Sequence, residues 1–209
     1  IYALRKSCIN PSYSKNLNAL STTNKNVIAI DTIIQMINPI EFWFESGLRT
    51  SDILLTANMI KPIPHQINSL IDASFKYVHK TQYISFIDYI NSNIATNIYG
   101  NKKIISLEEK YVRDTDIDCI REINIWKVFF IRTNSKVYVS HYKWDRAHIP
   151  ANYAIKDIGG ISALLQTSYY CFPAAHEAIM TDIYFTFTNK IVSIEEHSGS
   201  KIQYVVVTG

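Results

Sequence analysis

A glutamate at the start of an apolar segment is the side chain in this sequence best suited to chemistry. Glu177 follows Ala175-His176 and precedes Ala178-Ile179-Met180. Where a loop meets a rigid strand, a carboxylate can hydrogen-bond a ribose hydroxyl and stabilise an oxocarbenium-like centre. This chemistry breaks glycosidic bonds such as the one between nicotinamide and ribose. A solvent-facing glutamate at a sheet edge would have the same sequence surroundings, so both interpretations stay open.

The common hydrolase and phosphate-binding motifs are absent from the sequence. It contains no GxSxG, no HExxH and no glycine-rich phosphate loop, and His176-Glu177 has no second histidine four residues on. The three cysteines, Cys8, Cys119 and Cys171, follow neither CxxC nor Cys/His metal spacing. We therefore predict no metal site, and a disulfide with one cysteine left over competes with three buried thiols.

Composition and charge narrow the class of protein. The chain has 209 residues, 47% hydrophobic and 19% charged, which excludes disordered and collagen-like classes. The net charge is only +3 and the basic residues are scattered, so we predict no nucleic-acid partner. No apolar run approaches the roughly 18 to 20 residues of a membrane-spanning helix. The chain starts at Ile1 rather than Met, and we expect a processed, secreted factor.

The local patterns predict a single α+β domain over residues 1–209, with 1–40 as an N-terminal extension or first layer and 41–209 as the core. Helical spacing or caps favour helices mainly before Gly100, and β-branched and aromatic runs favour an antiparallel or mixed sheet after it. The predicted helices are 27–37, 53–60, 65–75, 83–94 and a segment after Gly159-Gly160. The predicted strands are 42–44, 76–79, 123–131, 137–142, 179–187, 191–195 and 203–207, with hairpins expected around 133–135 and 197–200.

The order of these expected elements resembles the cholera- and pertussis-type ADP-ribosyltransferase toxin domains. The similar stretches in the second half are IWKVFFIRTNSKVYV (125–139), AAHEAIM around Glu177, and KIVSIEEHSG. Upstream, YVHKTQYISFIDYI (77–90) is similar to the Ser-Thr-Ser strand of that family and the helix after it. LRTSDIL (48–54) resembles the family's arginine-bearing strand-to-helix entry. The likeness covers roughly residues 42–203.

This resemblance implies a function and roles for individual residues. The domain would bind NAD and transfer ADP-ribose to a host protein, with a delivery subunit as a plausible further partner. Glu177 would stabilise the ribosyl cation, Arg49 would anchor the phosphates, and Thr81 would orient the substrate with its hydroxyl. His79 would lie beside Arg49 and Thr81 in the NAD site.

Several positions depart from the pattern of the family. Phe44 stands where the family arginine follows an aromatic residue, and the nearest arginine is Arg49. His79-Lys80-Thr81 replaces Ser-Thr-Ser, with Ser21-Thr22-Thr23 as a rival match. Ala175 stands two residues before Glu177, where many members carry Gln or Glu.

Two alternatives to the transferase therefore stay open. One is a catalytically inactive domain of the same fold that binds through aromatic residues, and the other is a small secreted ribonuclease that uses histidine and glutamate as base and acid. The aromatic candidates are Tyr142, Trp144, Tyr169 and Tyr170. The histidine candidates are His141, His148, His176 and His197.

Overall fold

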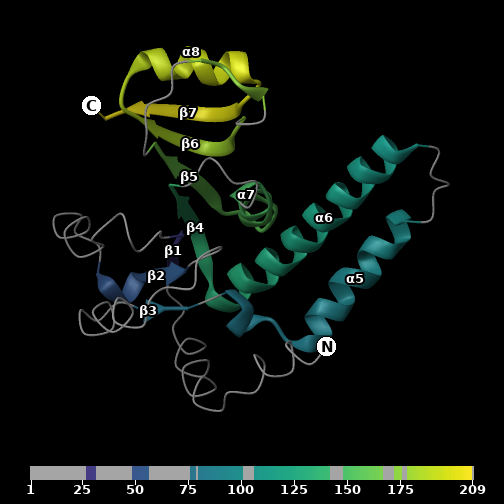
Figure 1. Ribbon diagram of the computed structural model, residues 1–209. Helices are drawn as coiled ribbons and strands as arrows, with labels where there is room; N and C mark the ends of the chain where they lie inside the picture. The colour runs from purple at the N-terminus through teal and green to yellow at the C-terminus, as the bar shows by residue number, and fades with distance from the viewer. Residues whose placement is uncertain are drawn as a thin grey trace, which may run out of the picture.

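In the computed structural model, seven strands form one parallel sheet with helices packed against it (Figure 1). The structure describes residues 27–31, 49–56, 76–78, 80–100, 106–141, 148–166, 172–175 and 178–208. The strands are β1 Val27–Asp31, β2 Ile53–Thr56, β3 Lys76–Tyr77, β4 Ser135–Ser140, β5 Ile161–Leu165, β6 Met180–Thr186 and β7 Lys201–Val207. The helices are α5 Phe86–Gly100, α6 Leu107–Thr133, α7 His148–Asp157 and α8 Asn189–Ser198, with short 3-10 turns η1 Thr50–Asp52 and η2 Lys80–Tyr83.

The strand order is β3-β2-β1-β4-β5-β6-β7, and every neighbouring pair is parallel. From β1 the chain builds outward through β2 to β3. It then returns through α5 and α6 and starts again at β4, on the other side of β1. Parallel neighbours need a crossover connection, which α7 supplies between β4 and β5 and α8 supplies between β6 and β7.

This topology shows that the predicted α+β class with an antiparallel or mixed sheet was wrong. The fold is of the α/β type, in which helices alternate with parallel strands rather than preceding them. Both predicted hairpins are helix-to-strand junctions: α6 leads into β4, and α8 leads into β7. Residues Val27–Asp31, within the range that we assigned to an extension or first layer, form an inner strand of the sheet.

The predicted strand 123–131 lies in the second half of helix α6. Ser106 caps this helix by accepting a hydrogen bond from the Glu109 amide at 3.1 Å, and Asn134 ends it in the left-handed conformation at φ 53°. The buried residues Trp126, Phe129 and Phe130 follow the helical spacing of three and four. Packing of this aromatic face against the sheet outweighs the local preference for a strand.

The other errors concern apolar segments without a clear period. Within the predicted helices 27–37 and 53–60, the structure describes the strands β1 and β2, and all four side chains of β2 are buried. A strand buried on both faces loses the alternation that identifies strands in a sequence. The predicted strand 191–195 lies in α8, and the predicted helix after Gly159-Gly160 is β5. The predicted strands at β3, β4, β6 and β7 and the helix at α5 are confirmed, whereas segments 42–44 and 65–75 lie outside the described residues.

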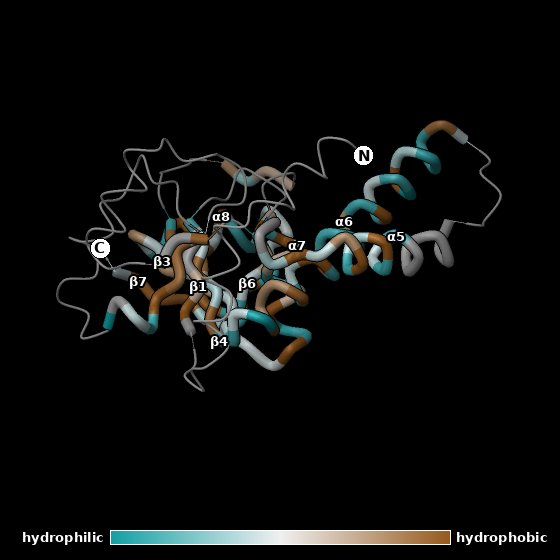
Figure 2. The backbone as a smooth tube through the Cα atoms, turned by 90° about the horizontal axis from the view of Figure 1, so that it is seen from below, coloured by the Kyte–Doolittle hydropathy of each residue, from teal (hydrophilic) through white to brown (hydrophobic). Residues whose placement is uncertain are grey.

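The main core lies between α6, α7 and the centre of the sheet. Trp126 is fully buried, and its ring centroid lies 5.4 Å from that of Phe129, 5.2 Å from that of Phe130 and 5.5 Å from that of Tyr138 on β4. Lys80 in η2 places its Nζ 4.9 Å from the centroid of the Trp126 ring. In Figure 2, hydrophobic and hydrophilic residues alternate along α6, whereas the strands to its left include long hydrophobic stretches, drawn in brown.

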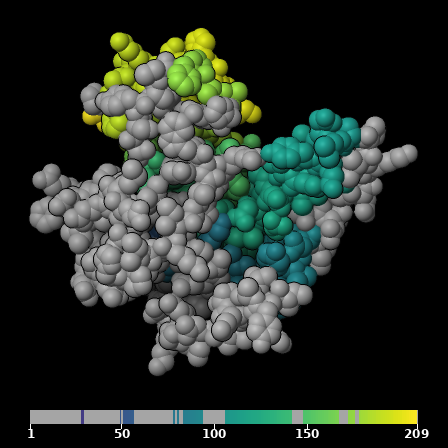
Figure 3. Space-filling model, viewed as in Figure 1, coloured from purple at the N-terminus to yellow at the C-terminus, as the bar shows by residue number. Residues whose placement is uncertain are grey.

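A second apolar cluster on the sheet includes Ile53, Leu55, Val139 and Ala163, which alternate with the residues that face α6 and α7. At the far end of the sheet, Ile191 of α8 packs with the buried side chains of β5 and β6. The α5–α6 hairpin projects from one side of the molecule (Figure 3). Among the described helices, none combines the length and the apolar character that crossing a membrane requires.

Two substitutions in the segment 123–131 test its helical placement. Trp126→Ala should lower the free energy of unfolding by about 3–5 kcal/mol, because it leaves a cavity in the aromatic core. Ile131→Ala in the same helix should change it by less than about 0.5 kcal/mol, because Ile131 is 65% exposed. Urea unfolding measures both. A large loss of stability in Ile131→Ala would contradict the packing of α6.

Candidate functional site at the carboxyl edge of the sheet

The direction of chain winding changes between β1 and β4. From β1 the chain proceeds to β2 and β3 on one side, and from β4 it proceeds to β5, β6 and β7 on the other. In open parallel sheets the loops after two such neighbouring strands diverge, and this leaves a crevice outside their carboxyl ends where ligands bind. The carboxyl ends of β1 and β4 are therefore the first place to look for a site.

Buried polar side chains gather at this edge of the sheet. Each lies at or just beyond the last residue of a strand or at the first residue of α7, and each is less than a tenth exposed. They are Thr56 at the end of β2, Ser140 at the end of β4 and His141 just after it, His148 at the start of α7, Gln166 after β5, and Thr186 at the end of β6. Burial of polar groups costs free energy unless they are hydrogen-bonded, so this concentration calls for partners.

Toward the β6 side, the structure supplies those partners. The Gln166 Oε1 atom accepts a hydrogen bond from the Thr186 hydroxyl at 2.6 Å and another from the Phe187 amide at 2.9 Å. These bonds join the ends of β5 and β6. At this part of the edge, the buried side chains of Gln166 and Thr186 therefore have hydrogen-bond partners within the protein.

Two buried hydroxyls on either side of β1 lack hydrogen-bond partners in the described part of the chain. Thr56 Oγ1 and Ser140 Oγ are both buried, and neither has a hydrogen-bond partner among the residues that the structure describes. Because Thr56 lies two residues after Leu54, and Ser140 two residues after Tyr138, both hydroxyls lie on the sheet face that packs against α6 and α7. The two unpartnered hydroxyls thus flank the strand at which the winding changes direction.

Asp31 is the last residue of β1 and lies between them in the register. It pairs with Thr56 of β2, and the residue before it, Ile30, pairs with Val139, the neighbour of Ser140. By register, Asp31 thus occupies the carboxyl end of the central strand, between the positions of Thr56 and Ser140.

Helix α7 begins at the same edge. It connects the parallel strands β4 and β5 and must run back across the sheet, so its amino end lies near the carboxyl ends of those strands. His148 occupies its first position, and Pro150 falls within the first turn, where its missing N–H breaks no helical bond. The free amides and partial positive charge of a helix amino end attract anions, above all phosphate.

The residues proposed from the sequence lie elsewhere or outside the described part of the chain. Arg49 precedes β2 at the amino edge of the sheet, where its guanidinium pairs with Asp52 at 2.8 Å. Thr81 lies in η2 after β3, and η2 packs against α6. Glu177, His79 and the side chain of Thr81 lie outside the described residues. Convergence of these groups on one NAD molecule therefore stays a prediction.

The alternative candidates are only partly described. Of the four histidines, His141 and His148 are buried at the carboxyl edge, whereas His197 is exposed near the end of α8, its Nδ1 2.7 Å from the Ser193 carbonyl oxygen. His176 and the aromatic candidates Tyr142, Trp144, Tyr169 and Tyr170 lie outside the described residues.

Of the cysteines, the structure describes Cys119, a free thiol in α6. Partial burial, and then the nearby Asp116 and Glu122 carboxylates, raise its pKa and so make it a poor nucleophile. Cys8 and Cys171 lie outside the described residues, so the disulfide prediction stays open. No group of three or more His, Cys, Asp or Glu side chains within the described ranges could hold a metal ion.

Comparison with known proteins adds no relative: no family model, curated protein or solved structure matches the chain. The sequence does carry one signal that we did not use: the apolar runs of β2 (ILLT) and β4 (SKVYVS) each end in a small hydroxyl residue. Recognising both runs as parallel strands would have placed Thr56 and Ser140 at one edge.

A pair of isosteric substitutions tests whether the Thr56 hydroxyl lacks a partner. Thr56→Val removes a buried hydroxyl without a hydrogen bond and should raise the free energy of unfolding by about 1 kcal/mol. Thr186→Val removes the bond to Gln166 and should lower it by about 1–2 kcal/mol. Thermal and urea unfolding of the unliganded protein measure both effects. Equal destabilisation by the two variants would show that Thr56 is already satisfied within the protein.

Proposed function

We propose that this chain is a nucleotide-binding domain whose ligand lies across the carboxyl ends of β1 and β4. The observation that carries the proposal is the pair of buried, unpartnered hydroxyls of Thr56 and Ser140 on either side of β1. A bound nucleotide offers ribose hydroxyls and phosphate oxygens, both of which can complete such hydrogen bonds. The ligand would thereby offset the cost of burying these two groups.

The strand order supports a nucleotide over other polar ligands. The order 3-2-1-4-5-6 is that of doubly wound sheets that bind dinucleotides, and here a seventh strand extends it. This support is an analogy at the level of the fold. The sequence has no glycine-rich loop, so the phosphates would rest on the amino end of α7 rather than on a tight turn after β1.

NAD is the nucleotide that we propose to test first. The resemblance of the sequence to ADP-ribosyltransferase domains implies NAD, and the strand order independently favours a dinucleotide. In the proposed reaction the bond between nicotinamide and ribose breaks and neutral nicotinamide leaves. A side chain of the acceptor protein bonds to the ribose carbon and releases a proton to the solvent. The resemblance implies that Glu177 stabilises the ribosyl cation, that Arg49 anchors the phosphates and that Thr81 orients the substrate. Arg49 lies before β2, and Ala178, the neighbour of Glu177, lies before β6, both at the amino edge of the sheet. The transfer step is therefore proposed separately from nucleotide binding at the carboxyl edge.

Calorimetric titration of the 209-residue chain tests the binding step. NAD should bind the wild-type protein, and Ser140→Ala should weaken binding by about fivefold to tenfold, because it removes one hydrogen bond to the ligand. The control is Ser193→Ala, an exposed serine on α8, which should leave the affinity unchanged. AMP and UDP serve as further probes of nucleotide specificity. If none of the three nucleotides binds, or if Ser140→Ala binds like the wild type, the proposal is wrong.

Labelling of a cell lysate with tagged NAD tests the transfer step separately. Glu177→Gln keeps the size of the side chain and removes its charge, so it should abolish labelling while leaving the unfolding transition unchanged. Labelling that persists in this variant would rule out the role of Glu177. Binding of NAD without any labelling by the wild type would rule out transfer to proteins in that lysate and leave the binding proposal intact.

A further inference from the structure

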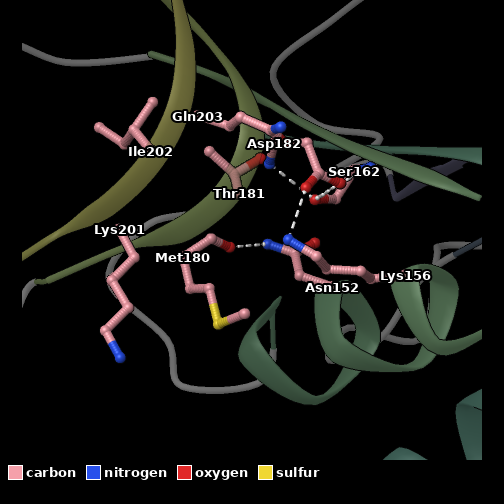
Figure 4. A pocket seen from close by; sticks show the side chains of 9 residues that line it. All are labelled: Asn152, Lys156, Ser162, Met180, Thr181, Asp182, Lys201, Ile202 and Gln203. Carbon is pink, nitrogen blue, oxygen red and sulfur yellow. Dashed lines mark hydrogen bonds and ion pairs between the residues drawn. The ribbon is translucent and has the colours of Figure 1, made fainter.

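A pocket lined by both polar and apolar side chains lies at the opposite edge of the sheet. It has a volume of about 250 Å³ and lies between α7 and the amino ends of β5, β6 and β7 (Figure 4). The residues that matter for its chemistry are Asn152, Lys156, Met180, Asp182 and Lys201. None of them belongs to the carboxyl-edge site, since the strands contribute their first residues here and their last residues there.

One wall of this pocket is fixed by a network around Asp182. Its Oδ2 atom accepts hydrogen bonds from the Ser162 amide and the Ser162 hydroxyl, both at 2.9 Å, and the Asp182 amide donates to the same hydroxyl oxygen at 3.0 Å. Lys156 on α7 places its Nζ 3.2 Å from Asp182 Oδ1. Desolvation raises the pKa of Asp182, but the bonds from Ser162 and the pairing with Lys156 outweigh it and leave the pKa lowered. Lys156 is thus paired with Asp182, and the bonds to Ser162 hold the Asp182 carboxylate in place.

Two other polar groups in the pocket take no part in this network. Asn152 is 1% exposed, and its Nδ2 atom donates to the Met180 carbonyl at 2.5 Å, but its Oδ1 atom has no hydrogen-bond partner in the described part of the chain. Lys201, at the start of β7, forms no ion pair with any described residue, although it lines the pocket. Its side chain extends beside that of Met180 in Figure 4. The pocket thus combines an exposed lysine without an ion pair among the described residues, a buried amide oxygen and the thioether of Met180.

We propose that this pocket binds a small hydroxylated organic anion. Its acidic group pairs with Lys201, a hydroxyl donates to Asn152 Oδ1, and its carbon chain packs against Met180. The acceptor on Asn152 selects a ligand with a donor group, which simple anions such as chloride lack. The volume lies below the roughly 300 Å³ at which pockets begin to enclose drug-sized molecules, so the ligand is a compact metabolite. A carboxylate and a phosphate monoester share this chemistry, and two probes separate them.

Titration of the 209-residue chain with glycerate and with glycerol 3-phosphate tests the proposal. The protein contains three methionines, so the methyl NMR signal of Met180, assigned with Met180→Leu, reports binding within the pocket. At least one probe should shift this signal in a saturable way, and the stronger probe identifies the acidic group. If neither probe shifts it at concentrations up to about 10 mM, which corresponds to only about 2.7 kcal/mol of binding free energy, the proposal is overturned.

Charge variants provide the matched control. Lys201→Gln should weaken binding at least about fivefold, in keeping with the loss of a charge-assisted hydrogen bond. Lys190→Gln removes an exposed lysine from α8 that does not line the pocket, and its affinity should equal that of the wild type. Equal affinity of Lys201→Gln and the wild type would refute the role of Lys201 and with it the proposal. The affinity for NAD should be the same in both variants, so this test is independent of the nucleotide proposal.

Discussion

The packing of Trp126 against Tyr138 holds the two main parts of this fold together. Trp126 belongs to α6, which returns the chain from the β3 side of the sheet, and Tyr138 belongs to β4, where the second half of the sheet begins. Ala29 of β1 and Leu54 of β2 lie in the same buried cluster. This single apolar contact surface thus fixes the position of β4 next to β1. The crevice expected at their carboxyl ends depends on α6, which brings these two strands together.

The buried polar side chains at the two edges of the sheet differ in their hydrogen-bond partners. At the amino edge, Asp182, Ser162 and Lys156 form a network, and Asn152 Oδ1 beside them has no hydrogen-bond partner among the described residues. At the carboxyl edge, the hydrogen bonds of Gln166 close the β5–β6 side, whereas the hydroxyls of Thr56 and Ser140 are left without partners in the described residues. Buried polar groups without partners are a cost that folding alone does not repay, and they mark where a ligand is expected.

Individual elements differ in how far the sequence predicts them. Helix α5 is readable because Ser85 and Asp88 form reciprocal bonds at its start: the Ser85 amide donates to the Asp88 carboxylate at 2.7 Å, and the Asp88 amide donates to the Ser85 hydroxyl at 3.2 Å. Strand β7 is readable because its residues Tyr204 to Val207 are β-branched or aromatic. The sequence at the end of α6 is misleading because its aromatic residues favour a strand locally, while 27 residues separate the two helix caps, Ser106 and Asn134. The candidate site at Thr56 and Ser140 depends on strand order, which pairs segments far apart in the sequence and is not encoded in either segment alone.

The pairing of β1 with β4 also determines how the protein must fold. Val27 pairs with Ser135, so the central strands meet only after a loop of more than 100 residues has closed. The α5–α6 hairpin and the β4-α7-β5 and β6-α8-β7 units involve short sequence separations and can form first. The edge between β1 and β4 is therefore completed late, and a fragment that lacks either half of the chain cannot contain it. On a ribosome, the crevice would be absent until β4 has emerged and found β1.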